Sequence, residues 1–321
     1  MPLSIQEGAA LLTDVHRSIG SRILGQDDAI DDALAAFVAR GHILIEGVPG
    51  TAKTLLARSL AAALGLKFGR IQFTPDLMPA DVTGVSLYRA HTNSFEFQPG
   101  PVFTELLLAD EINRAPAKTQ SSLLEAMGER QVTVDGTSRP LDGAFTVIAT
   151  QNPVEHEGTF PLPEAQLDRF LLKVVIGYPS AEAELAILEL HEQGFDPEAG
   201  QKVPLLVPTL APGQSRDVRA LIDQVRVAPE VRQYISAITR ATRDDPALSL
   251  GASPRATVAV MRVARAGAVL EGRDYVTPDD VKTRAIAALR HRITLAPEVE
   301  VEGRTADEVL ASVLARTPTP A

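Results

Sequence analysis

A segment near residue 50 combines the residue types that bind phosphate groups. It reads HILIEGVPGTAKTLLARSLAAALG (residues 42–65): an apolar run, a glycine-bearing loop, and then apolar residues at helical spacing. In the pattern G-x-x-x-x-G-K-[ST], backbone N–H groups and the lysine contact phosphate oxygens, and the hydroxyl ligates Mg²⁺. We therefore predict a nucleotide-binding loop. Its candidate residues are Gly47, Pro49, Gly50, Thr51, Ala52, Lys53, Thr54 and Leu55, with Thr54 also a metal ligand.

Residue 52 is glycine in the usual pattern but alanine in this chain. A methyl group is tolerated at that place if the residue takes right-handed helical backbone angles. Alanine adopts these angles readily at the entrance to a helix, so we expect Ala52 to be right-handed. A plain glycine turn beside a surface lysine is the alternative interpretation of the loop.

Acidic and amide side chains follow two further apolar runs. The run ELLLADE ends in Asp110 and Glu111, and IATQNP places Asn152 after another run. Carboxyl ends of parallel strands are where ligands bind, so Asp110 is a candidate metal ligand and Glu111 a candidate base for the attacking water. Asn152 can bind that water or the γ-phosphate. The alternatives are a helix-capping acidic pair and a turn asparagine.

Two arginines complete the candidate catalytic set. Arg255, in GASPRATV, lies in the first turn of a predicted helix, where the helix dipole disfavours a cation; a bound anion would explain its place. Arg169, in EAQLDRFLL, precedes the last predicted strand. A surface pair with Asp168 is the alternative interpretation of Arg169.

The elements that must position these residues alternate along the first part of the chain. Apolar runs separated by helical stretches predict a parallel sheet covered by helices on both faces. These runs cover residues 42–47, 67–73, 105–110, 145–150 and 171–177. Two insertions, at 81–103 and 130–149, have the form of hairpins, the second turning at Asp135-Gly136. We predict an α/β domain over 1–180 and a helical domain over 181–321.

The sequence of the second part of the chain predicts where two of its helices begin. Ser253-Pro254 and Thr277-Pro278 each place a capping hydroxyl before a first-turn proline. A Pro/Gly-rich connector over residues 194–214 precedes these helices.

Composition restricts the function classes. The formal net charge is −10 and aromatic residues make up 4% of the chain, which argues against a nucleic-acid-binding surface. Cysteine is absent, which excludes disulfides and thiolate metal sites. The six histidines have no ligand spacing, and the segment around His156 reads as a polar turn. Neither a secretory signal nor a membrane-spanning run is recognisable, so we expect a cytoplasmic protein.

Together these segments resemble the AAA+ ATPases and, among them, the MoxR family. The resemblance rests on LIEGVPGTAKT, LLLADEINRAPAKTQSSLLEAM, ATQNPVEHEGTFPLPEAQLDRF and GASPRA, and it covers nearly the whole chain. MoxR-like proteins carry alanine at the place of Ala52. The resemblance implies an AAA+ P-loop domain followed by an all-α lid, with ATP and Mg²⁺ as cofactors. It also implies that Gln26, in ILGQDDAI, lines the adenine pocket.

The resemblance further implies roles for the residues outside the loop. Asn152 corresponds to the first sensor, and Arg255 to a second sensor that reads the γ-phosphate of its own subunit. Arg169 corresponds to an arginine finger that reaches the nucleotide of a neighbouring subunit, which requires a ring, typically a hexamer. Arg114 matches the family as well, and a subunit contact is one open role for it.

The function that follows is ATP-driven, chaperone-like remodelling of partner proteins, with lid closure through Arg255 moving the hairpins. The resemblance implies a von Willebrand factor A domain partner, an unknown protein client, and in some cases metal or cofactor insertion. A nucleic-acid motor is the alternative from another class. We expect it to be disfavoured, because hairpins 81–103 and 130–149 lack a basic stripe and stacking aromatic residues. A nucleotide-gated binding module without turnover is a third possibility.

Overall fold

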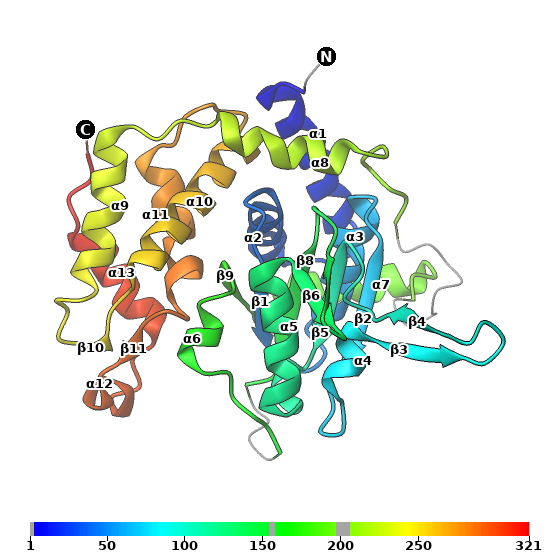
Figure 1. The fold of residues 1–321 in the computed structure, drawn as a ribbon. Coiled ribbons are helices and arrows are strands. Elements are labelled where there is room, and N and C mark those ends of the chain that lie inside the picture. The colour runs from blue at the N-terminus through cyan, green and yellow to red at the C-terminus, as the bar shows by residue number, and fades with distance from the viewer. Residues whose placement is uncertain (1–2, 154–157, 197–205, 321) are drawn as a thin grey trace.

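A computed structural model describes residues 3–153, 158–196 and 206–320 of the 321-residue chain. The predicted polar turn at His156 and part of the predicted connector, residues 197–205, lie outside the described residues. Figure 1 shows a central sheet with helices around it and a group of helices at one side that includes the C-terminal segment.

The central sheet has five parallel strands, as predicted. In the order β2-β5-β8-β1-β9 they are Phe68–Gln72, Leu106–Asp110, Thr146–Gln151, Ile43–Gly47 and Leu172–Ile176. Register pairs such as Ile43 with Ile148, and Leu106 with Thr146, align the strand ends. All five carboxyl ends therefore lie at one edge of the sheet, and all five amino ends at the other.

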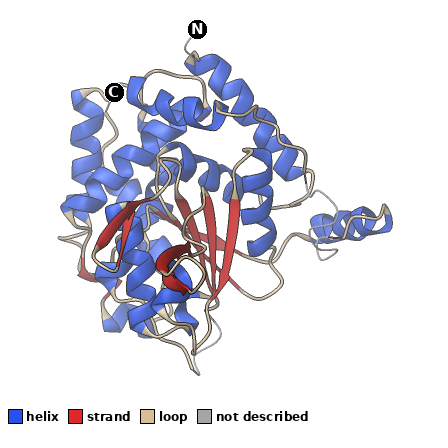
Figure 2. Cartoon of the chain, turned by 45° about the vertical axis from the view of Figure 1, so that its right-hand side comes forward, coloured by secondary structure: helices blue, strands red, loops and turns tan. Residues whose placement is uncertain are grey.

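Alternate residues of the strands face two separate buried clusters. Ile43 and Ile45 of β1 join one cluster with helices α1, α2 and α3, whereas Leu44 joins the other with α4 and α5. This is the period-2 alternation of a sheet that is covered on both faces. The helices are α1 (Ile5–Gly20), α2 (Asp27–Val38), α3 (Lys53–Ala63), α4 (Pro79–Thr83) and α5 (Ala117–Glu129). Figure 2 shows helices on both sides of the strands.

Both predicted hairpins are present. The first pairs β3 (Gly84–Arg89) with β4 (Ser94–Pro99), and Figure 1 shows it projecting from the body of the molecule. The second pairs β6 (Gln131–Val134) with β7 (Thr137–Pro140). Asp135 and Gly136 both have positive φ, as a two-residue hairpin turn requires. The second insertion is shorter than predicted, because residues 146–149 belong to β8.

The described residues of the second part are mainly helical, with a short antiparallel pair of β10 (Leu248–Leu250) and β11 (Thr294–Leu295) and an isolated bridge between Arg226 and Tyr275. Its helices begin where the sequence predicts: Ser253 caps α10 and Thr277 caps α11. A four-residue α6 and a three-residue η1 interrupt the loops of the first part. The remaining elements are η1 (Ile112–Arg114), α6 (Glu164–Leu167), α7 (Ala181–Glu192), α8 (Gln214–Ala220), η3 (Leu221–Gln224), α9 (Pro229–Ala241), α10 (Pro254–Leu270), α11 (Pro278–Leu289), α12 (Pro297–Val301) and α13 (Ala306–Arg316).

A single buried cluster crosses between the two parts. It contains Leu12 of α1, Leu34 of α2 and Val263 of α10, and α10 packs directly on α1 and α2. The helical part therefore shares a buried core with the first face of the sheet. Within the described residues, no helix is both long enough and apolar enough to span a bilayer.

Candidate functional site

The loop after β1 has the close approach and the backbone angles of a phosphate-binding loop. Gly47 lies against β9, where an added Cβ would meet the Ile176 carbonyl oxygen at 2.5 Å. Gly50 has φ 84° and open space around it. These two positions therefore require glycine for different reasons, one steric and one conformational.

Ala52 does not have the backbone conformation expected from the sequence. It lies at φ 61° and ψ 19°, in the left-handed region, immediately before α3. The expectation of right-handed angles is wrong because the loop must turn sharply from β1 into the helix, and residue 52 takes that turn. A non-glycine residue in this region costs about 1–2 kcal/mol, which the surrounding structure offsets.

Lys53 and Thr54 begin α3 beside this turn. The Lys53 ammonium donates to the carbonyl oxygens of Gly47 and Val48, at 2.7 Å each. Thr51 is buried, and its hydroxyl donates to Val48 at 2.8 Å. A cation is thus held inside the loop, where phosphate oxygens would bind.

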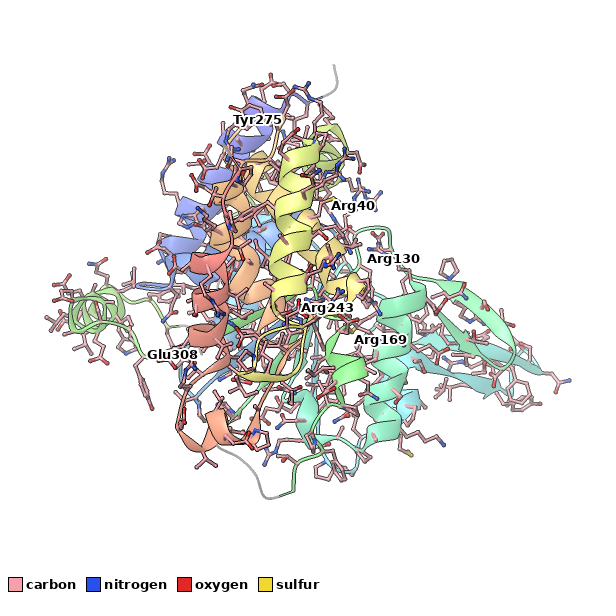
Figure 3. The ribbon with its side chains drawn as sticks, turned by 90° about the vertical axis from the view of Figure 1, so that its left-hand side faces the viewer. Arg40, Arg130, Arg169, Arg243, Tyr275 and Glu308 are labelled. Atoms are coloured by element: carbon pink, nitrogen blue, oxygen red, sulfur yellow. The ribbon has the colours of Figure 1, made fainter. Side chains whose placement is uncertain are left out.

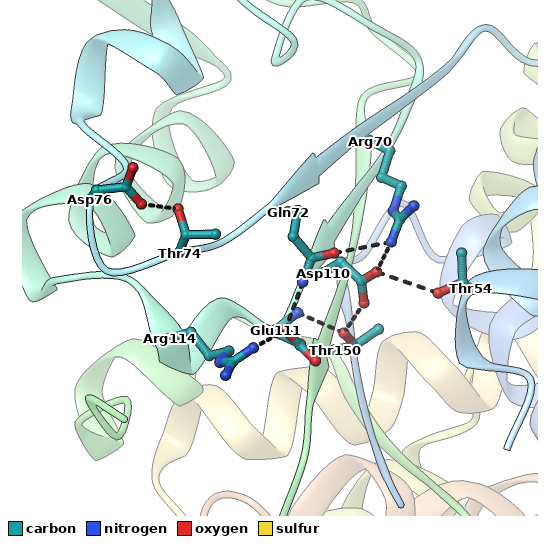
Figure 4. Close-up of polar contacts among 9 residues, drawn as sticks. All are labelled: Thr54, Arg70, Gln72, Thr74, Asp76, Asp110, Glu111, Arg114 and Thr150. Carbon is teal, nitrogen blue, oxygen red and sulfur yellow. Dashed lines mark hydrogen bonds and ion pairs between the residues drawn. The ribbon is translucent and has the colours of Figure 1, made fainter. Parts of the chain in front are cut away.

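Asp110 is the centre of a polar network at the end of β5, drawn in Figure 4. One carboxylate oxygen accepts from Arg70 at 2.7 Å and lies 3.4 Å from the Thr54 hydroxyl, and the other accepts from Thr150 at 2.7 Å. Asp110 is only 7% exposed, so these partners offset the cost of burying its charge.

Glu111 follows in a strained conformation. Its φ is 55°, and its backbone N–H donates to the Thr150 hydroxyl at 2.8 Å, which fixes the turn. The carboxylate accepts from Gln72 at 2.6 Å and from Arg114 at 3.1 Å (Figure 4). A non-glycine residue held in left-handed angles is a feature of functional sites, and here the carboxylate of Glu111 has partners separate from those of the Asp110 carboxylate.

Asn152 and Gln26 lie at the same edge of the sheet. Asn152 follows β8, which lies between β5 and β1, and it is 5% exposed. Gln26 immediately precedes α2 and donates to the Gly177 carbonyl, just after β9, at 3.2 Å. The carboxyl edge thus collects the loop, the acidic pair, the amide and the predicted adenine-side residue.

The donors present fit a magnesium ion. Mg²⁺ prefers oxygen ligands and usually takes one or two from protein together with phosphate and water oxygens. Thr54 and Asp110 offer a hydroxyl and a carboxylate 3.4 Å apart, at the mouth of the loop. The Arg70 guanidinium on Asp110 would have to move for that carboxylate to face a metal.

Arg169 and Arg255 lie at the opposite, amino edge. Both line a cavity of about 300 Å³ that also includes Gly41 and His42, which precede β1. Arg255 Nε lies 3.5 Å from Asp168, and Arg169 donates to the Leu124 carbonyl at 2.5 Å. Figure 3 shows Arg169 on the same side of the molecule as Arg40 and Arg130.

This position corrects the role expected for Arg255. The loop lies at the carboxyl end of β1, and the five residues of that strand separate the two edges by roughly 16 Å. Arg255 therefore cannot read the phosphates of its own chain in this arrangement. The helix bearing it packs on α1 and α2, which places its first turn beside Asp168.

His42 stabilises the same amino edge as a neutral side chain. Its Nδ1 accepts from the Val147 N–H at 3.0 Å, so Nε2 carries the proton and donates to Met127 at 3.3 Å. Burial, with Arg130 nearby, lowers the pKa of His42 to about 3. Burial also lowers the pKa of His291 well below its ordinary value; its Nε2 lies 3.0 Å from the Phe170 carbonyl.

Sequence reasoning missed three residues of the Asp110 network: Arg70, Gln72 and Thr150. Arg70 and Gln72 lie two apart on β2, so they share one face, and the register pairs Gln72 with Asp110. The alternation in KFGRIQF shows that they share a face. It does not show which strand lies beside β2, and that neighbour decides their role.

The expectation that hairpin 81–103 lacks stacking aromatic residues is also wrong. Tyr88 is 54% exposed and Phe95 is 74% exposed. Their rings pack with centroids 5.4 Å apart across the hairpin. Tyr88 and Phe95 are paired across β3 and β4, so both rings lie on the same face of the hairpin. The described core residues of the domain do not cover that face.

Comparison with known proteins agrees with this geometry. Residues 42–172 match the family described as "ATPase family associated with various cellular activities (AAA)", and residues 240–313 match an AAA lid domain. Chaperone MoxR1 of Mycobacterium tuberculosis is 41% identical, over 91% of this chain and 78% of that protein. Protein MoxR of Paracoccus denitrificans is 31% identical, over 94% and 93% respectively.

The chain belongs to the MoxR family of AAA+ ATPases.

Two further relatives extend over almost the full length. YeaC of Bacillus subtilis is 46% identical over 96% of both chains. A crystal structure from Cytophaga hutchinsonii matches with a TM-score of 0.88 at 39% identity, over 98% of this chain and 96% of that one. The resemblance to MoxR proteins is confirmed, as is the fold of an AAA+ domain with a lid. Membership in this ATPase family supports ATP hydrolysis as the activity of this MoxR-like chain.

Proposed function

We propose that this MoxR-like protein hydrolyses ATP in a ring of identical subunits and uses the hydrolysis to remodel partner proteins. The observation that carries the proposal is the division of the site between two edges of the sheet. The loop and the acidic pair lie at the carboxyl edge, and Arg169 lies at the amino edge. A head-to-tail ring would bring one edge of each subunit to the other edge of the next.

Within one subunit, the residues at the carboxyl edge bind and orient ATP. Lys53 and the loop N–H groups would hold the phosphates, and Gln26 would contact the adenine. Thr54 and Asp110 would hold Mg²⁺, which neutralises phosphate charge. Glu111 would accept a proton from the attacking water, and the buried Asn152 amide would orient that water.

The second half of the site would come from the neighbouring subunit. Arg169 would act as the arginine finger, and Arg255, in the same cavity, would act beside it on the same phosphates. This assigns both cations to the adjacent subunit and replaces the same-subunit role first expected for Arg255. A monomer would then lack the charge that stabilises the transition state and would hydrolyse ATP slowly.

The remodelling part rests on the relatives and on the hairpins. A relative 41% identical is named a chaperone, and the β3–β4 hairpin presents Tyr88 and Phe95 to solvent. Exposed aromatic residues on a projecting hairpin suit contact with apolar segments of a protein client. We propose a von Willebrand factor A domain partner, by family resemblance, and maturation of the client, including metal or cofactor insertion, as the outcome.

The exposed aromatic pair also favours a second candidate, a nucleic-acid motor, because such rings can stack on bases. The charges of the hairpin argue against it: Arg89 is paired with Glu96 at 3.2 Å, which leaves little cationic surface to follow a phosphate backbone. DNA that stimulates ATP hydrolysis, with an effect that falls steeply as salt is added, would favour the motor.

Capture of the partners under ATP-bound conditions tests the proposal. Glu111→Gln should bind ATP and lose turnover, because the amide cannot accept the proton of the attacking water. Affinity purification of this variant from the native cell should then enrich a von Willebrand factor A domain protein, compared with Lys53→Ala as the nucleotide-free control. Enrichment of chromosomal DNA, with no protein partner, would overturn the chaperone assignment.

A further inference from the structure

Helix α7 (Ala181–Glu192) has an apolar face that the described residues of its own chain leave exposed. None of its twelve residues, all of which the structure describes, is buried. Leu185 and Leu188, three residues apart, are 64% and 63% exposed, and Ile187 is 43% exposed. The helix touches the rest of the chain near Gly25, where an added Cβ would lie 2.8 Å from that of Ala183. An isolated helix of this length gains most of its stability from packing, so its outer face favours a partner.

Four glutamates on α7 give this face a negative charge. Glu184, Glu189 and Glu192 are exposed beside the leucines, and Glu182 lies in the first turn. The partner of α7 should therefore combine a basic surface with a small apolar area.

The chain carries such a surface on its other side. We call it the arginine face, and it lines two cavities, of about 500 and about 300 Å³, that share Arg40. Val258, 51% exposed, lies among these arginines. The residues of the arginine face are Arg40, Arg130, Arg216, Arg219, Arg255 and Arg262.

Carboxylates neutralise only part of the positive charge of the arginine face. Arg40, Arg216 and Arg255 form ion pairs with Asp223, Asp142 and Asp168, whereas Arg130, Arg219 and Arg262 form none with the described residues. Arg219 is 3% exposed, and two of its guanidinium nitrogens have no hydrogen-bond partner among the described residues. Burial and the neighbouring Arg130 and Arg40 lower the pKa of Arg219 to about 10, and burial with Arg130 also lowers the pKa of Arg262. Additional carboxylates placed here would relieve this repulsion.

The two surfaces lie on opposite sides of one molecule. Figure 2 shows α7 standing out from one side, and Figure 3 shows Arg40, Arg130 and Arg169 on another side, away from it. α7 also begins four residues after Gly177, which Gln26 contacts at the expected adenine side of the nucleotide site. Bringing the neighbour's Arg169 to the phosphates therefore brings the neighbour's arginine face toward α7.

We infer that α7 of each protomer docks on the arginine face of the next copy, with its glutamates against the arginines and its leucines against Val258. This inference rests on the proposed ring and names the second contact that holds it. The contact is heterologous, so each interface uses α7 of one protomer and the arginine face of the next. Repetition of this contact around a rotation axis closes a ring.

Directed cross-linking tests the contact, because the chain has no cysteine of its own. Leu188→Cys protomers are mixed with Val258→Cys, Arg40→Cys or Arg216→Cys protomers in the presence of Mg-ATP and a short bismaleimide. Cross-linked dimers should form with at least one of the three partners. Val301→Cys, at a residue 89% exposed on α12, is the matched control and should give none with the same partners. Cross-links only between two Leu188→Cys protomers, or none in assembled rings, would overturn the inference.

A second experiment separates this contact from the ring itself. The double variant Leu185→Ser, Leu188→Ser should raise the concentration needed for assembly by at least about tenfold, because two apolar contacts are lost. Val301→Ser should not change it, and both variants should bind ATP as monomers. Normal assembly of the double variant would refute docking by α7 and leave the ring intact. Absence of assembly in the unmodified chain would instead refute the ring.

Discussion

At the carboxyl edge of the central sheet, charged groups are paired within the chain, whereas at the amino edge arginines gather with few carboxylates among them. Asp110 has Arg70 and Thr150 as partners, and Glu111 has Gln72 and Arg114. The cavity at the amino edge is lined by six arginines and one carboxylate, Asp168, among the described residues. The contrast teaches that the first edge pairs its own charges within the chain, while the second has positive charge left for another molecule.

The largest expected effect comes from removing Arg169, the proposed arginine finger. Arg169→Ala should bind ATP normally and lose about 10³–10⁵-fold in turnover, the range for arginine fingers in other phosphoryl-transfer enzymes. The measurement is steady-state hydrolysis together with nucleotide affinity. Arg17→Ala, at an exposed arginine on α1 paired with Asp14, is the control and should retain the normal rate. Unchanged turnover in Arg169→Ala would remove that residue from the site.

Mixing two inactive variants tests whether the two edges act together across one subunit interface. Lys53→Ala protomers keep an intact amino edge, and Arg169→Ala protomers keep an intact carboxyl edge. Mixed rings should regain part of the turnover, since some interfaces then combine both intact edges. If mixing restores nothing, although mixed rings form, Arg169 acts within its own subunit or not at all.

A smaller effect concerns the neutral histidines at the amino edge. The pKa of His42 is about 3 in the folded chain, below the ordinary value of about 6.5 for the unfolded chain. As pH falls below about 6.5, the unfolded state takes up a proton that the folded state does not, so stability decreases. At pH 5 this amounts to roughly 2 kcal/mol for His42.

Denaturant unfolding between pH 7 and pH 5 measures this loss. His42→Asn should be less stable at pH 7 and should show a clearly shallower decrease, with the remaining slope coming from His291 and other groups. His91→Gln, at an exposed histidine, should keep the original slope. A variant slope equal to that of the unmodified chain would contradict a neutral, buried His42.

The smallest effect concerns backbone strain at the carboxyl edge. Ala52→Gly should relieve about 1–2 kcal/mol of left-handed strain, partly offset by about 0.5–1 kcal/mol of extra chain entropy in the unfolded state. A net gain within about 1 kcal/mol, measured by thermal unfolding, is expected, with ATP affinity retained. Gly50→Ala is the matched reverse change: its φ is 84° and its added methyl meets open space, so it should destabilise through the backbone alone. Destabilisation by Ala52→Gly would show that the methyl packs.

The sequence predicts the carboxyl edge better than the amino edge, for a physical reason. The loop residues and the pair Asp110-Glu111 lie within short segments whose own strand and turn pattern fixes their place. The conformation of Ala52 was mispredicted because a permissive residue type does not reveal the angle that a turn demands. The partner of Asp110, Arg70, depends on which strands are neighbours, and that order is set by the packing of the whole domain.

The position of Arg255 in the fold also depends on packing, in this case between segments far apart in the sequence. Its capping motif correctly predicts the start of α10 and the first-turn place of the arginine. Which edge of the sheet that first turn faces depends on the packing of α10 against α1 and α2, which are more than two hundred residues away in sequence. Local sequence patterns therefore predict Arg255 and its helix, but not which subunit's ATP this arginine would contact.

The core that joins α1, α2 and α10 has a mechanical consequence. A swing of the lid over its own nucleotide would pull Leu34 and Val263 out of a dry interior, and the cost of exposing them opposes that motion. In the proposed ring, ATP hydrolysis would cause neighbouring protomers to slide or tilt against each other at their interfaces. If the protomer moves as a rigid body, a displacement at one interface also moves the next interface. This would couple successive nucleotide sites around the ring.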